Sequence, residues 1–183
     1  SEASSWEPLR GSLLNLSYGN GKVFVIPHET VEGGMQGGMC ALPIPPFPTG
    51  VMRGRFHPKD GQLYLCGMVA WASDRATPGG LYRLRATGKP SYLPTALRAT
   101  RTGIAIAFTD PIDRSTASDP SNYSVKTWAI KRTENYGSKH YDERTLRVGG
   151  VSVSDDGRTV TLKLPEIHPT WGMEIAYRIQ IGR

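Results

Sequence analysis

Hydrophobic and polar positions alternate along most of the chain with a period of two. In GIAIAFT, residues 103–109, the side chains of Ile104, Ile106 and Phe108 share one face, and EIAYRIQI, residues 174–181, repeats the pattern. Successive side chains point to opposite sides of a β-strand, whereas a helix needs a period of about 3.6. The pattern predicts strands here and in four further segments, 12–18, 52–58, 80–86 and 122–133.

Three segments share one turn signature. SYGNGKVFVI (17–26), HPKDGQLYLC (57–66) and VSDDGRTVTLKL (153–164) each carry Asn-Gly or Asp-Gly before a run rich in apolar residues. Such pairs supply the two positive φ angles of a type I′ turn, whose twist matches that of the flanking strands. We therefore expect a tight β-hairpin at each of these corners.

Only one segment favours a helix. DRSTASDPSNY (113–123) offers serine and aspartate as caps, and Pro120 would end the helix. We expect at most one short helix there, so the predicted fold class is all-β.

The chain changes character at ATGKPSYLPTALRAT. Pro90 and Pro94 fix φ and remove two backbone donors, which makes this stretch a semi-rigid connector. We place a boundary near residue 91. Residues 1–90 would form an antiparallel unit rich in glycine and proline, and the strand spacing of residues 91–183 is typical of a small sandwich.

Composition agrees with many short strands. The chain has 183 residues, 38% of them hydrophobic, with 21 glycines and 14 prolines. Its mean hydropathy is −0.36. No run of 18 apolar residues occurs, and SEASSWEPLR lacks a basic region followed by an apolar one, so we expect neither a membrane span nor an export signal in this sequence.

The net charge of +6 is spread evenly along the chain. Residues 1–90 hold nine Lys/Arg and six Asp/Glu, and residues 91–183 hold thirteen and ten. The basic segments MRGRF and LYRLRATGK alternate with apolar residues, which places their arginines on one face of a strand. A solvated strand face is the preferred interpretation, and we expect no nucleic-acid partner.

The two cysteines, Cys40 and Cys66, are expected to be structural. They have no CxxC spacing and fall on separate predicted strands. A disulfide in an exported protein and a pair of buried thiols both remain open, and the disulfide is preferred because the composition resembles that of secreted proteins.

HETVEGGMQGGMC, residues 28–40, is the stretch with the most reactive side chains. His28, Glu29, Met35, Met39 and Cys40 could together hold copper or haem iron. The preferred interpretation is a long loop whose glycines provide turns and whose methionines fill gaps in a core. Such a loop can still line a pocket, with His28 and Gln36 as candidate ligand contacts.

A second polar loop, NYGSKHYDE, contains Tyr136, His140 and Tyr141. Aromatic faces stack on the C–H groups of sugars while their polar atoms form hydrogen bonds, so these residues are candidate saccharide contacts. The alternative, which we prefer, is a loop fixed by its own tyrosines. Trp71 is a further candidate contact, expected near a loop and exposed like Trp171, whereas the mid-strand Trp128 is expected in the core.

Motifs of known catalytic centres are absent from the sequence. There is no GxSxG, HExxH or phosphate-binding loop, so we expect no cofactor and leave open whether the protein is an enzyme.

The quoted segments also resemble a family. GGMQGGMCALPIPPFPTGVMRGRFHPKDGQLYLCGMVAW, GGLYRLRATGKP and GIAIAFTDPIDRSTASDPSNYSVKTWAIKRTENYGSKHY resemble the C-terminal part of large secreted proteins of planctomycete and verrucomicrobial type. In those proteins a β-propeller similar to that of sugar dehydrogenases precedes an immunoglobulin-like domain, often with a c-type cytochrome elsewhere. The resemblance implies propeller blades in residues 1–90 and an immunoglobulin-like sandwich in 91–183. No CxxCH haem-attachment motif occurs in this chain.

Two functions follow as hypotheses. The first is a non-catalytic binding or accessory module of a secreted or periplasmic protein, whose partners are a polysaccharide or other domains of a larger parent chain. The second is a fragment of a secreted quinone- or haem-linked oxidoreductase resembling sugar dehydrogenases, with HETVEGGMQGG lining its cofactor pocket. A structural spacer is the third alternative.

Overall fold

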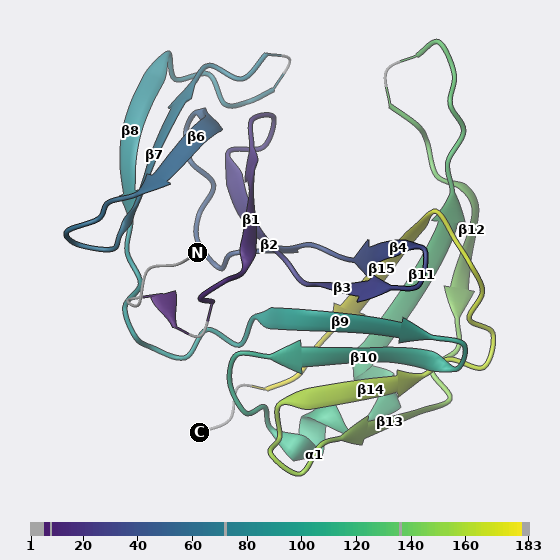
Figure 1. Cartoon of the computed structure of the whole chain (residues 1–183). Helices are drawn as coiled ribbons and strands as arrows, with labels where there is room; N and C mark the ends of the chain where they lie inside the picture. The colour runs from purple at the N-terminus through teal and green to yellow at the C-terminus, as the bar shows by residue number, and fades with distance from the viewer. Residues whose placement is uncertain (1–5, 8, 72, 136, 181–183) are drawn as a thin grey trace. The chain divides into compact units, whose positions relative to one another are not determined.

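The chain folds into several small antiparallel sheets (Figure 1). This computed structural model describes residues 6–7, 9–71, 73–135 and 137–180, and none of their sheets closes into a barrel. The all-β prediction is confirmed. No helix in the described ranges is long and apolar enough to cross a membrane. The chain forms two compact units, Ser1–Leu97 and Arg98–Arg183.

The first unit contains three sheets. Their strand orders are β1-β2-β5, β3-β4 and β6-β7-β8. The strands are β1 (Leu13–Ser17), β2 (Lys22–Ile26), β3 (His28–Val31), β4 (Gly34–Gly37), β5 (Cys40–Ala41), β6 (Gly50–Phe56), β7 (Leu63–Met68) and β8 (Gly79–Leu84).

Alternate residues of β2 and β7 form the centre of the first core. Val25 and Leu65 are fully buried, and Val23 and Leu63 are nearly so. Trp6, from the N-terminal segment, is 5% exposed and meets Phe56 edge to face at 5.2 Å between ring centroids. Burial of these apolar faces is the main stabilising contribution to the unit.

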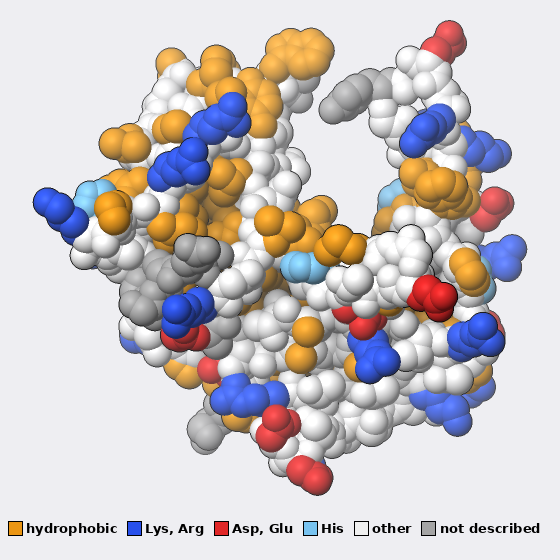
Figure 2. Space-filling view, in the orientation of Figure 1, with side chains coloured by type: hydrophobic (Ala, Val, Ile, Leu, Met, Phe, Trp, Pro, Cys, Tyr) orange, Lys and Arg blue, Asp and Glu red, His pale blue; other side chains and the backbone are white. Residues whose placement is uncertain are grey.

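The surface of the first unit is unusually apolar. Of twelve large hydrophobic side chains exposed among the described residues, ten lie before residue 98. Figure 2 shows hydrophobic side chains gathered over this unit, with Lys and Arg among them. The second unit contributes only Ile130 and Trp171 to the twelve.

The second unit contains two sheets, with strand orders β13-β14-β10-β9 and β12-β11-β15. Ile104 and Ile106 of the first and Val125 of the second are buried, and Phe108 meets Tyr177 edge to face at 5.7 Å. The strands are β9 (Pro94–Thr100), β10 (Gly103–Phe108), β11 (Tyr123–Ala129), β12 (Tyr141–Leu146), β13 (Gly150–Val153), β14 (Thr159–Lys163) and β15 (Gly172–Tyr177).

The short helix forms where the sequence predicts it. Helix α1 (Arg114–Ala117) begins at Asp113, whose carboxylate accepts a hydrogen bond from the Thr116 amide at 2.8 Å. Pro120 opens a separate 3₁₀ turn, η2 (Pro120–Asn122). Helix α1 has therefore already ended at Ala117 before the chain reaches Pro120, where the sequence predicted that it would stop.

The three predicted hairpins are present, but the prediction of type I′ turns is wrong. They join β1 to β2, β6 to β7 and β13 to β14. In each corner only the glycine has a positive φ: 60° at Gly21, 65° at Gly61 and 70° at Gly157. In two of the corners the preceding aspartate instead accepts a backbone hydrogen bond: Asp60 from the Gln62 amide at 2.9 Å and Asp156 from the Arg158 amide at 3.0 Å. Such Asx turns stabilise the longer loops observed.

The glycine-rich stretch after β2 is a hairpin, where a long loop was expected. β3 pairs with β4 from His28 opposite Gly37 to Val31 opposite Gly34. The two-residue turn is Glu32-Gly33, and Gly33 has a φ of 85°. Most residues of both strands are exposed. The hairpin therefore has no buried apolar face, and the sequence shows no hydrophobic alternation that would have predicted it.

Tyr123 connects α1 to the core of the second unit and makes the stability of that unit depend on pH in the alkaline range. Its hydroxyl donates to the Ala117 carbonyl at 2.7 Å, and burial raises the pKa of Tyr123 to about 12. In the unfolded chain the Tyr123 hydroxyl loses its proton near pH 10, so the stabilisation from the raised pKa is complete below about pH 10 and is lost as the pH rises toward 12. We expect the free energy of unfolding to fall between about pH 10 and 12.

Urea unfolding of wild type and Tyr123→Phe at a series of pH values tests this expectation. Subtraction of the two curves removes the titration of other groups. A difference that stays constant from pH 9 to 12 would contradict it.

Candidate functional site

The sequence-predicted contact residues are divided between the two units. His28, Gln36 and Trp71 belong to the first, and His140 and Tyr141 to the second. Tyr136 lies outside the described residues.

The β3–β4 hairpin does not bring its candidate ligands together. His28 and Met35 share one face by register, whereas Glu29 and Gln36 lie on the other, joined by a hydrogen bond of 2.5 Å. Met35 and Met39 are 66% and 67% exposed, so the prediction that these methionines fill a core is wrong. No cluster of three or more His, Cys, Asp or Glu that could hold a metal occurs within the described ranges.

Both cysteines are free thiols, so the preferred disulfide is wrong. Cys40 lies in β5 opposite Val25, and Cys66 lies in β7, a strand of a different sheet. Cys66 is exposed, which also differs from the expected pair of buried thiols. Cys40 is half-buried, and this burial raises the pKa of its thiol.

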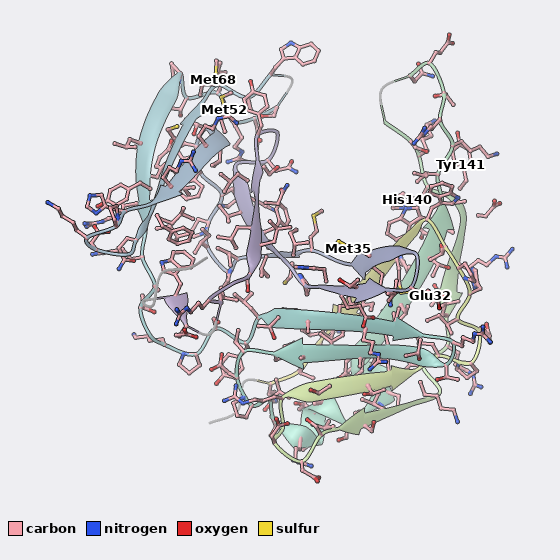
Figure 3. The ribbon with its side chains drawn as sticks, viewed as in Figure 1. Glu32, Met35, Met52, Met68, His140 and Tyr141 are labelled. Atoms are coloured by element: carbon pink, nitrogen blue, oxygen red, sulfur yellow. The ribbon has the colours of Figure 1, made fainter. Side chains whose placement is uncertain are left out.

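An aromatic pair lies on the solvent-facing side of the β12-β11-β15 sheet. The rings of Trp128 and His140 stack at 4.0 Å between centroids with an angle of 12° between their planes. Figure 3 shows His140 and Tyr141 together beside the loop that joins β11 to β12. His140 is exposed and Trp128 half-buried, so the imidazole lies toward solvent from the indole.

Glu143 places charge beside the stacked rings. With Nδ1 protonated, His140 donates to Glu143 Oε2 at 3.1 Å, and Lys126 Nζ donates to Oε1 at 3.3 Å. These hydrogen bonds, first that of His140 and then that of Lys126, lower the pKa of Glu143. The carboxylate therefore stays ionised in neutral solution and holds both donors at the edge of the aromatic pair.

One further feature shapes this face. Gly172 lies opposite Trp128 in β15, and a Cβ at Gly172 would overlap the indole, so the absence of a side chain lets the ring lie across the strand. We call Trp128, His140, Glu143 and Lys126 the aromatic face.

Tyr141 faces the other side of the sheet. It pairs with Ala129, whose side chain alternates with that of Trp128. Lys131 Nζ lies 4.4 Å from the centroid of the Tyr141 ring, within cation–π range.

The prediction that Trp128 belongs to the core is wrong. Tyr123, Val125 and Thr127 are the buried residues of β11, so Trp128 points to the opposite side with Lys126. The side to which Trp128 points could have been predicted from the alternation of apolar and polar residues along β11. Trp71 and Trp171 are 87% and 73% exposed, as predicted.

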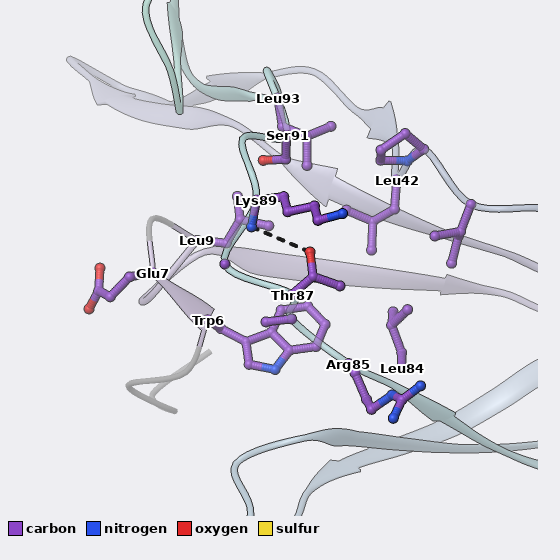
Figure 4. Close-up of a pocket in the computed structure, with 14 residues that line it drawn as sticks. Trp6, Glu7, Leu9, Leu42, Leu84, Arg85, Thr87, Lys89, Ser91 and Leu93 are labelled. Carbon is purple, nitrogen blue, oxygen red and sulfur yellow. Dashed lines mark hydrogen bonds between the residues drawn. The ribbon is translucent and has the colours of Figure 1, made fainter.

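The first unit also contains a small pocket (Figure 4). Its volume is about 130 Å³, and leucine side chains and Trp6 form much of its wall, with Arg85 and Lys89 among the lining residues. Drug-sized ligands occupy pockets of about 300–1,000 Å³. The pocket therefore does not fit a saccharide chain, and the aromatic face remains the candidate site.

Known proteins give no further assignment. No family model, curated protein or solved structure matches this chain.

Proposed function

We propose that this chain is a non-catalytic polysaccharide-binding module of an extracellular protein. In this proposal the first unit has propeller-blade character and the second is an immunoglobulin-like sandwich that carries the binding face. The chemistry of the aromatic face supports the assignment more than any other feature does.

The stacked pair of Trp128 and His140 is the observation on which the proposal depends. Sugars present flat C–H surfaces that pack on aromatic rings, and their hydroxyls need donors and acceptors at the ring edge. The exposed imidazole offers the ring, and Glu143 and Lys126 offer an acceptor and a donor. His140 and Glu143 are solvent-exposed, which suits a polysaccharide chain rather than a small enclosed molecule.

Residues of the first unit are less suited to saccharide. Trp71 is exposed, but the large side chains near it in the sequence, Met68 and Val69, are apolar and also exposed. The His28 face of the hairpin has Met35 and Thr30 as its other members by register. We therefore assign saccharide binding to the second unit.

Affinity electrophoresis against soluble xylan, mannan, galactan and β-glucan tests the proposal. We expect at least one polymer to retard the wild-type chain, and Trp128→Ala to weaken that interaction at least tenfold, because the exposed imidazole of His140 loses the indole on which it is stacked. Trp128→Phe keeps a ring and should retain part of the affinity.

Trp71→Ala is the matched control, since it removes an equally large ring from the other unit. Its retardation should equal that of wild type. Hydrogen exchange over β11 and β15 separates loss of binding from loss of folding. Failure of wild type to bind any polymer of the panel, or equal binding by Trp128→Ala, would contradict the proposal.

A further inference from the structure

The outer face of the β6-β7-β8 sheet, on the first unit, has one apolar half. Cys66 in the central strand lies opposite Leu81 on one side and Arg53 on the other. Leu81 is 75% exposed, and Met68, two residues beyond Cys66, is 44% exposed. Residues two apart in a strand point to the same side, so these side chains form a continuous surface.

A bulge in β6 enlarges this apolar half. The register with β7 shifts between Val51 and Arg53, so Met52 is the extra residue. Val51 is buried and Gly54 faces the core, which leaves Met52 and Arg53 both on the outer side. Figure 3 shows Met52 next to Met68 at the same end of the sheet.

The main chain around Trp71 is held at that end of the sheet by the side chain of Tyr18. The Tyr18 hydroxyl donates to the Val69 carbonyl at 2.6 Å and accepts a hydrogen bond from the Trp71 amide at 3.1 Å. Tyr18 lies in the β1–β2 loop, so the segment after β7 is tied to a second sheet. The main chain at Trp71 is thereby fixed while its side chain is 87% exposed.

The other half of this face is basic. Arg55, Tyr64 and Arg83 lie side by side across the three strands. Neither arginine, nor Arg53, forms an ion pair with another described residue, and no acidic residue occurs within the three strands. Asp60, which accepts from the Tyr64 hydroxyl at 2.9 Å, lies in the β6–β7 loop at the end away from Met68.

We propose that this face binds a different protein through an apolar segment flanked by carboxylates. Exposed tryptophan, methionine and arginine are the residues enriched in the centres of protein interfaces. A second copy of the chain is a poor occupant, because a two-fold contact would bring twice three arginines together against one nearby carboxylate per copy, that of Asp60. An acidic, apolar partner satisfies both halves.

Selection from a random peptide library displayed on phage tests the proposal, because such a library samples many combinations of apolar and charged residues. We expect enriched peptides to combine apolar residues with Asp or Glu. Synthetic copies should bind wild type, lose at least tenfold in affinity to Trp71→Ala and Leu81→Ser, and bind more weakly as salt is raised. A bound peptide should also protect Cys66 from alkylation.

Trp171→Ala provides the control, because it removes an exposed ring from the second unit and should leave peptide binding unchanged. Both test positions are exposed, and hydrogen exchange over β7 checks that the sheet is intact. The proposal is overturned by basic or wholly neutral consensus peptides, by equal binding to Trp71→Ala, by failure to enrich any peptide, or by wild-type sedimentation as a dimer that Leu81→Ser dissociates. Polysaccharide retardation by the same variants distinguishes this result from a failure of the aromatic face.

Discussion

Leu65→Ala is expected to destabilise the first unit by about 2–5 kcal/mol, the range measured for leucine truncations in protein cores. Leu65 is fully buried in the central strand of its sheet, opposite Tyr82 and Gly54. Truncation leaves a cavity among side chains that belong to several strands and to the N-terminal segment. Those neighbours collapse only partly, so both transfer energy and packing are lost.

Hydrogen exchange over residues 63–68 and 79–84 gives the measurement, because it reports this unit separately from the other. Leu81→Ala is the matched control, since it deletes the same atoms from the neighbouring strand at a position that is 75% exposed. Equal exchange in the two variants would show that Leu65 is not part of a packed core.

Gly103→Ala should destabilise the second unit by about 1–3 kcal/mol or more, for the opposite reason. Gly103 is buried at the start of β10, opposite Lys163. A Cβ there would overlap the Leu162 carbonyl oxygen and lie 3.0 Å from the Leu162 carbonyl carbon. These are backbone atoms of the paired strand, so the only relief is to separate β10 from β14.

Gly150→Ala is an unusually close control for this change. Gly150 pairs with the same Lys163 from the other side of β14, and a Cβ at Gly150 has no atom within 4 Å. We expect its effect to stay within about 0.5 kcal/mol. Urea unfolding followed by circular dichroism compares the variants, and similar midpoints for both alanines would contradict the steric account.

Strands with one buried face were predictable from the sequence because alternation encodes that burial directly. β10 is the clearest example, with Ile104, Ile106 and Phe108 all buried. The β3–β4 hairpin was not predictable by this route, since none of its side chains is fully buried and its half-buried pair, Glu29 and Gln36, is polar. Its stability comes from backbone pairing, which leaves no hydrophobic period.

The candidate site was predictable in part. His140 was identified from its residue type, but its partner Glu143 and the Lys126 that bonds Glu143 depend on how β11 and β12 align. That alignment contains an irregularity between Thr127 and Ala129, which no local pattern reveals. Trp128 shows the reverse case: its place in the middle of a predicted strand suggested the core, whereas the phase of that strand puts its side chain on the other face.

Tyr64 illustrates how one residue can couple two neighbouring segments. Its hydroxyl donates to Asp60, and its ring lies 5.6 Å from that of His57. The β6–β7 loop is thereby attached to the strand that follows it.

The position of Trp6 determines where this protein can be truncated at its N-terminus. Its indole is enclosed together with Leu9, although both precede the first strand by sequence. A shortened version starting at residue 10 would lack two side chains of the hydrophobic core, and the leucines around them would become exposed to solvent. A domain boundary placed at the first strand would therefore remove Trp6 and Leu9, which the first unit needs in order to fold.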